Sequence, residues 1–163
     1  MGNRGLGTRG AVWVATGLGL GLVSRAPGTG GGLWGLPLAW AVGYLPGTAV
    51  QALAIALAGL IGTAVCSVAA RAIGGSKDPQ AIVLDEIAAL PIVYLGVADK
   101  TLAIWLVGWL LFRLFDIAKP WPIRYLERLP RGWGIMADDW LAAAYACAVL
   151  HSLLWLNSAL SLG

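Results

Sequence analysis

Hydrophobic residues of this chain are gathered into six segments, and most of the charged residues lie in the short connections between them. The segments cover residues 11–23, 33–45, 48–73, 80–97, 101–117 and 135–160. Because a helix rises about 1.5 Å per residue, about 20 apolar residues are enough to cross the hydrocarbon layer of a bilayer. The pattern predicts an all-α fold, a polytopic helical bundle embedded in a membrane.

The first segment differs from the other five. Its 13 residues are too few for a straight crossing, which takes about 20, and it contains Gly17, Gly19 and Gly21. A glycine-rich turn at residues 27–32 follows it. We therefore expect a re-entrant or tilted N-terminal segment that packs against the other helices.

Proline marks two of the predicted helix boundaries. Asp78 followed by Pro79 is typical of a helix start, with an N-cap residue and a proline at the first helical position. Residues 119–122 predict a helix end, since two of them are prolines, which lack the N–H group that a helix needs. No internal repeat or domain boundary is evident, so we expect one membrane-embedded domain over residues 1–163.

The composition agrees with a membrane protein. Hydrophobic residues make up 59% of the chain and charged residues 12%, whereas charged residues make up about 25% of soluble domains. The mean hydropathy is +0.78. So little polar surface fits neither a disordered chain nor an ordinary soluble domain. No nucleic-acid partner and no protein partner are predicted.

Lysine and arginine are unevenly divided between the two sides of the predicted bundle. Lys100, next to Asp99, is the one basic residue on one side. Basic residues mark cytoplasmic loops, so we expect a multi-pass membrane protein with its basic side facing the cytoplasm. Ten of the eleven basic residues fall on that side if Arg25 belongs to the re-entrant turn: Arg4, Arg9, Arg25, Arg71, Lys77, Arg113, Lys119, Arg124, Arg128 and Arg131.

Two acidic pairs interrupt apolar segments at similar shallow depths below the basic side. An unpartnered carboxylate in apolar surroundings is costly or takes up a proton. Clusters of carboxylate oxygens suit hard divalent cations, and Mg²⁺ accepts a few carboxylates together with water and substrate phosphate. The pairs therefore predict a Mg²⁺ site with four ligands, Asp85, Glu86, Asp138 and Asp139.

Three charged residues, Arg113, Asp116 and Lys119, follow one another at intervals of three at the end of the fifth apolar segment. This spacing places them on one face of a helix. Arg113 and Lys119 are predicted to bind the phosphate of a substrate. Asp116, between them, is predicted to orient Lys119 or to act as a base toward water. The predicted catalytic residues are Asp85, Glu86, Asp116 and Asp139.

Each of these groups also has a simpler interpretation. The dipole of a helix can stabilise acids at its start, which suits Asp138 and Asp139 better than Asp85, expected two turns into its helix. Arg113 and Lys119 can be topology determinants that reach the headgroups. The glycine-rich turn can bind phosphate through its amides or serve as an elbow. Only the convergence of acids and bases at one depth favours a site.

A short amphipathic helix is predicted on the membrane surface after residue 120. Apolar residues alternate there with Arg124, Arg128 and Arg131, whose charges attract anionic headgroups at about 1 kcal/mol each. The segment can equally be a plain anchor. Anionic membrane lipid is an expected partner of the protein.

Four regions of the chain resemble the phosphatidylglycerophosphatase A family, in the family's order and over nearly the whole length. They are residues 112–123 (FRLFDIAKPWPI), 134–139 (GIMADD), 82–86 (IVLDE) and, near the start, 15–19 (ATGLG) with 26–29 (APGT). The resemblance implies a bacterial inner-membrane phosphatase that depends on Mg²⁺. Such an enzyme removes the terminal phosphate of phosphatidylglycerophosphate and gives phosphatidylglycerol, in phospholipid biosynthesis.

The resemblance also carries functional residues onto this chain. The family's two acidic blocks and its arginine–aspartate–lysine block fall on Asp85, Glu86, Asp138, Asp139, Arg113, Asp116 and Lys119. Attack by water and a phosphoaspartate intermediate both stay open. The alternatives are a phosphatase of another lipid phosphate and a non-enzymatic small cation channel or transporter.

Overall fold

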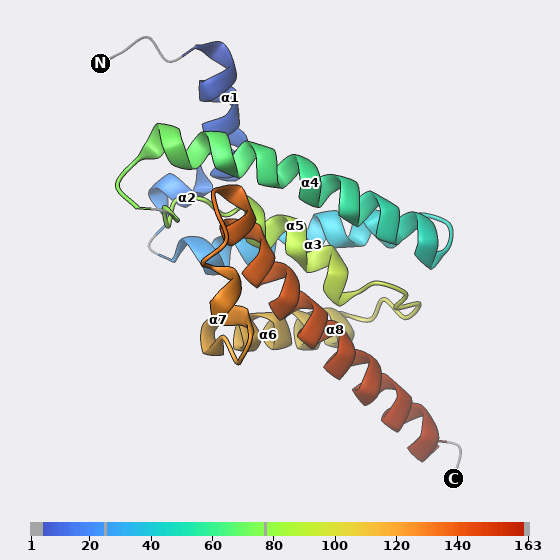
Figure 1. Cartoon of the computed structure of the whole chain (residues 1–163). Coiled ribbons are helices and arrows are strands. Elements are labelled where there is room, and N and C mark those ends of the chain that lie inside the picture. The colour runs from blue at the N-terminus through green and yellow to red at the C-terminus, as the bar shows by residue number, and fades with distance from the viewer. Residues whose placement is uncertain (1–4, 25, 77, 162–163) are drawn as a thin grey trace.

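The computed structural model describes residues 5–24, 26–76 and 78–161, and these residues form helices and short connections with no strand among them (Figure 1). This confirms the all-α prediction. The helices are α1 (Leu6–Ala15), α2 (Leu20–Val23), α3 (Pro27–Val42), α4 (Thr48–Ile73), α5 (Leu84–Val93), α6 (Leu102–Ala118), α7 (Ile123–Leu126) and α8 (Gly132–Ser161).

Helices α3, α4, α5, α6 and α8 run alternately between two ends of the molecule. At one end, Gly28 of α3 lies against Glu86 of α5. At the same end, the amide of Gly132 at the start of α8 donates to Ser67 Oγ, near the end of α4, at 2.9 Å. Helices α3, α5 and α8 therefore begin where α4 and α6 finish, and we call this the convergent end of the bundle.

Two hydrogen bonds join the connections at the opposite end. Lys100 Nζ donates to the carbonyl of Gly43 at 3.1 Å, and the amide of Gly96 donates to Gln51 Oε1 at 3.3 Å. The first bond links the segment before α6 to the end of α3, and the second links the segment after α5 to the start of α4. The division into two sides inferred from the basic residues therefore matches the two ends of the bundle.

The N-terminal segment does not form one continuous helix. Helix α1 ends at Ala15, and Gly17, Leu18 and Gly19 follow with positive φ angles, a conformation that glycine adopts readily. The amide of Val83 donates to the carbonyl of Ala15 at 2.9 Å, so the end of α1 lies beside the start of α5. Residues 27–32, expected as a turn, form the first turns of α3, because Pro27 suits a first helical position.

One predicted helix boundary is wrong and one is confirmed. Asp78 and Pro79 do not start a helix, because the amide of Ile82 donates to the carbonyl of Pro79 in a turn at 2.8 Å, and α5 begins only at Leu84. The predicted end at residues 119–122 is confirmed, since α6 finishes at Ala118.

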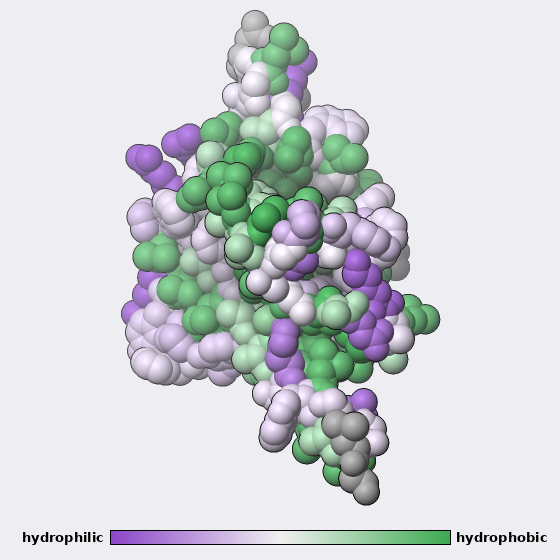
Figure 2. Space-filling view, turned by 90° about the vertical axis from the view of Figure 1, so that its right-hand side faces the viewer, coloured by the Kyte–Doolittle hydropathy of each residue, from purple (hydrophilic) through white to green (hydrophobic). Residues whose placement is uncertain are grey.

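Apolar side chains cover the outside of the bundle as well as its interior. Of the described helices, α4 and α8 are long and apolar enough to cross a membrane. Only 28% of the most apolar 18-residue stretch of α4 and 22% of that of α8 is buried, whereas a core helix of a soluble protein would be mostly buried. Figure 2 shows apolar side chains over large parts of one face. These helices are compatible with association with a membrane.

Glycine allows close contact between α4 and α8 at the convergent end. A Cβ built at Gly132 would overlap the backbone carbonyl oxygen of Thr63 and lie 3.0 Å from the backbone nitrogen of Ser67. Backbone atoms cannot move aside as a flexible side chain can, so the two helices would have to separate.

We predict that Gly132→Ala destabilises the protein by about 1–3 kcal/mol through this overlap. The measurement is thermal unfolding in a neutral detergent. Gly10→Ala in α1 is the matched control, because a Cβ there meets nothing within 4 Å and alanine favours a helix by about 1 kcal/mol over glycine. Equal unfolding temperatures for the two variants would contradict the packing argument.

Candidate active site

Asp85 and Glu86 lie in the first turn of α5, not two turns into a helix as expected. The amide of Glu86 donates to Asp85 Oδ1 at 3.0 Å. The positive end of the helix dipole stabilises negative charge in a first turn, so the dipole accounts for part of the stability of this pair. It does not supply the full countercharge that a buried carboxylate needs.

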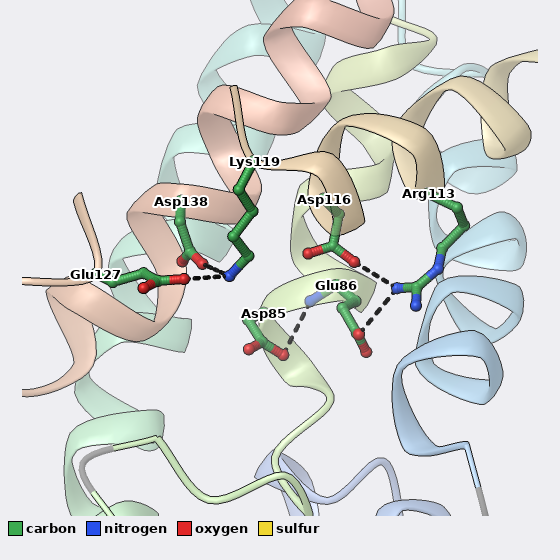
Figure 3. Close-up of polar contacts among 7 residues, drawn as sticks. All are labelled: Asp85, Glu86, Arg113, Asp116, Lys119, Glu127 and Asp138. Carbon is green, nitrogen blue, oxygen red and sulfur yellow. Dashed lines mark hydrogen bonds and ion pairs between the residues drawn. The ribbon is translucent and has the colours of Figure 1, made fainter. Parts of the chain in front are cut away.

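Arg113 connects α5 to α6. Its Nη1 atom lies 3.2 Å from Glu86 Oε1 and 2.6 Å from Asp116 Oδ2, one turn further along α6 (Figure 3). The three side chains are between 12% and 16% exposed, so these ion pairs are largely shielded from solvent. Asp116 thus orients Arg113 and does not pair with Lys119, the residue that it was predicted to orient.

Lys119 connects the end of α6 to α8. Its ammonium group lies 2.7 Å from Asp138 Oδ2 and also pairs with Glu127, in the segment after α7. Lys119 has a φ of 42°, which ends α6 and directs the chain away from the helix axis. Burial alone would lower the pKa of Lys119, but its hydrogen bonds to Asp138 and Glu127 raise this pKa above the ordinary value, so the side chain stays charged.

Asp85 and Asp139 are buried, and neither has a basic partner within the part of the chain that the structure describes. They are 7% and 4% exposed, and the ion pairs formed within the described chain use Arg113 and Lys119 with other carboxylates. The negative charges of Asp85, Asp116 and Asp138 repel a negative charge on Asp139. One oxygen each of Glu86 and Asp138 is also buried without a hydrogen-bond partner.

The first turns of α3 form one wall of this region. A Cβ built at Gly28 or Gly31 would overlap a carboxylate oxygen of Glu86, and the one at Gly28 would also lie 3.1 Å from Arg113 Nη2. A Cβ at Gly32 would lie 2.9 Å from Trp109 Nε1, a buried donor without a partner. The glycine-rich residues thus bring the backbone of α3 against the acidic and basic side chains.

Most of the predicted site residues meet at the convergent end. In Figure 3 the side chains from α5, α6 and α8 point toward a common region. Asp139 is close enough to Asp85 and Glu86 for their negative charges to repel one another. Over residues 5–24, 26–76 and 78–161, no three acidic, histidine or cysteine side chains already have the arrangement of a metal site. The predicted Mg²⁺ ligands are therefore neighbours, but they are not arranged around a common point.

Two contributors were not among the predicted site residues. Glu127 shares Lys119 with Asp138, and no spacing rule links it to α6, because it reaches Lys119 only through the fold. Trp109 lies one turn before Arg113 on α6, so the helical interval of four residues could have identified it.

Comparison with known proteins agrees with the resemblance seen in the sequence. The family model described as Phosphatidylglycerophosphatase A matches residues 13–154. A protein of that name from Haemophilus influenzae is 40% identical over 141 residues, which cover 86% of each chain. Another from Escherichia coli is 32% identical over 139 residues, which cover 85% of this chain and 80% of that protein.

A third relative, from Bacteroides thetaiotaomicron, is named provisionally as a phosphatidylinositol-3-phosphatase. It is 35% identical over 149 residues, which cover 88% of this chain and 93% of that protein. No solved structure matches the chain significantly. The family match spans all the site residues described above, from Asp85 to Asp139. The chain belongs to the phosphatidylglycerophosphatase A family.

Proposed function

We propose that the protein hydrolyses the terminal phosphomonoester of phosphatidylglycerophosphate to give phosphatidylglycerol. The observation that carries the proposal is the burial of Asp85 and Asp139 with no basic partner among the described residues, beside two basic side chains that can bind phosphate. The names of the Haemophilus influenzae and Escherichia coli relatives support this substrate. The direct test is release of phosphate from phosphatidylglycerophosphate in detergent micelles, compared with phosphatidic acid and phosphatidylinositol 3-phosphate.

The proposed setting is a bacterial inner membrane, which the longer helices cross several times with the convergent end at the cytoplasmic surface. Lys119, Arg124, Arg128 and Arg131 all belong to the connections at this end, as the positive-inside rule requires. Asp99 and Lys100 belong to the opposite end. The short helices α1 and α2 would enter from the cytoplasmic side and turn back at residues 16–19.

We propose Mg²⁺ as the cofactor, held by Asp85, Glu86, Asp138 and Asp139. The donor set fits, because carboxylate oxygens are the ligands that Mg²⁺ prefers, and Glu86 Oε2 and Asp138 Oδ1 are buried polar atoms without a partner. When bound, one or two such ions would polarise the phosphoryl group. They would also compensate the negative charge that Arg113 and Lys119 leave unbalanced.

The side chains of this protein would bind and orient the phosphate. Both ion pairs of Arg113 use Nη1, so its Nη2 atom can donate to a phosphate oxygen while Glu86 and Asp116 hold the guanidinium in place. Lys119 supplies a second positive charge for the developing negative charge. Asp116 can accept a proton from the attacking water through the oxygen not paired with Arg113.

Asp85→Asn and Asp139→Asn are expected to reduce magnesium-dependent phosphate release by roughly 100-fold or more, a typical effect of losing one group that stabilises a transition state. Asparagine keeps the size of the side chain but removes the charge. Asp99→Asn is the control, since Asp99 is exposed at the opposite end and should retain wild-type turnover. Near-normal turnover in both site variants would end the proposal of a carboxylate centre.

Mg²⁺ is expected to stabilise the folded protein, measured by thermal unfolding after EDTA treatment and readdition of the ion. At 100 times the dissociation constant the gain would be about 2.7 kcal/mol, or roughly 5–10 °C for a chain of this size. Asp139→Asn should lose most of this response. Its stability without metal should equal or exceed that of the wild type, because it relieves repulsion between buried carboxylates. A full Mg²⁺ response in this variant would contradict the ligand assignment.

Arg113→Lys is expected to lower kcat/KM by about 10- to 100-fold. Lysine keeps the charge, but it cannot stay bound to Glu86 and Asp116 through one nitrogen while donating to phosphate through another. The expected loss is that of one charge-assisted hydrogen bond. Arg9→Lys, on the exposed surface of α1, is the matched control. Equal kinetics for the two variants would remove Arg113 from phosphate binding.

A further inference from the structure

A groove with a volume of about 750 Å³ lies between α4 and the start of α8, apart from the carboxylate cluster. Its lining includes Arg71 near the end of α4 and Arg131 just before α8. None of the acidic residues of the candidate active site lines it. We propose that this groove binds one anionic diacyl phospholipid of the cytoplasmic leaflet, with the headgroup at the two arginines.

The two arginines provide positive charge that no ion pair within the described residues neutralises. The ion pairs within the described chain are those of Arg113 and Lys119, and Arg71 and Arg131 are exposed. Two guanidinium groups on one groove complement a phosphodiester, since each presents several N–H donors in a fixed plane.

The backbone around Arg131 supports a role for its side chain. Arg131 has a φ of 57°, a conformation that glycine adopts readily and other residues adopt at a cost. The carbonyl of the same residue accepts a hydrogen bond from the amide of Gly134 at 3.2 Å, at the start of α8. An arginine at this position places a charge at the rim of the groove.

The rest of the lining suits the acyl part of a lipid. Leu60, Ala64 and Val68 of α4 extend the groove away from Arg71, toward the middle of the proposed membrane. Trp133 also lines the groove and is 44% exposed; tryptophan is enriched at the level of the headgroups. Basic pockets between helices at the cytoplasmic surface are a known form of anionic lipid site. The groove thus has arginines for the headgroup of a phospholipid, a tryptophan at the level of the headgroups and an aliphatic wall for the acyl chains.

The inference depends on the proposed membrane setting but not on the phosphatase activity. A soluble phosphate ester would use the two arginines and leave the aliphatic wall unused. A zwitterionic lipid would use the wall and gain little from the arginines. An anionic phospholipid uses both, which is why we assign this class of ligand.

The test is native mass spectrometry of the full-length protein in a neutral detergent, titrated with phosphatidylglycerol or with phosphatidylcholine of the same acyl chains. We expect one phosphatidylglycerol to bind roughly 10- to 30-fold more tightly than phosphatidylcholine, from about 1 kcal/mol for each arginine. The double variant Arg71→Gln/Arg131→Gln should lose this preference. Arg9→Gln removes a basic charge from the exposed surface of α1, outside the groove, and should change the preference by less than about twofold.

A second variant tests the aliphatic wall separately from the charge. Ala64→Trp fills the groove, so it should weaken both lipids and leave the arginines in place. Thermal unfolding of each variant shows whether it is folded. An unchanged preference in Arg71→Gln/Arg131→Gln would overturn the proposal, as would glycerol 3-phosphate competing as strongly as the intact lipid.

Discussion

Carboxylates outnumber basic side chains within the candidate active site, and this local imbalance is the constraint on which the rest of this structure depends. Arg113 and Lys119 each serve two carboxylates, and Asp85 and Asp139 are buried with neither. Uncompensated negative charge in apolar surroundings has to be balanced by a cation or by protons. The Mg²⁺ ion proposed above would therefore contribute to the stability of the fold as well as to its chemistry.

The direction of the helices lowers the free-energy cost of burying these carboxylates. Helices α3, α5 and α8 all start at the convergent end, so the positive ends of their dipoles point toward the acidic side chains. Arg113 and Lys119 then join α5, α6 and α8 through ion pairs. The same contacts that hold three helices together thus position the groups proposed to bind the phosphate.

Much of this could be predicted from the sequence, because runs of apolar residues mark the helices and charged residues mark their ends. The predicted segment at residues 48–73 coincides with α4, and the predicted acidic and basic residues meet at one end. The start of α5 was missed because Asp78 and Pro79 have the local pattern of a helix start, whereas a tertiary hydrogen bond from Val83 to Ala15 sets the true boundary. The pairing of Lys119 with Glu127 depends in the same way on the folded path and has no sequence period.

Helix α8 carries the last of the acidic residues and contacts α4, α5, α6 and α7. During synthesis, Asp138 and Asp139 leave the ribosome after every other group proposed for the active site. Until then Lys119 lacks its buried partner, and the carboxylates of α5 that are proposed to bind a cation have no counterpart on α8. In the proposed membrane setting, hydrolytic competence would thus arise only once the final helix is in place, so that a nascent chain would not act on the surrounding lipids.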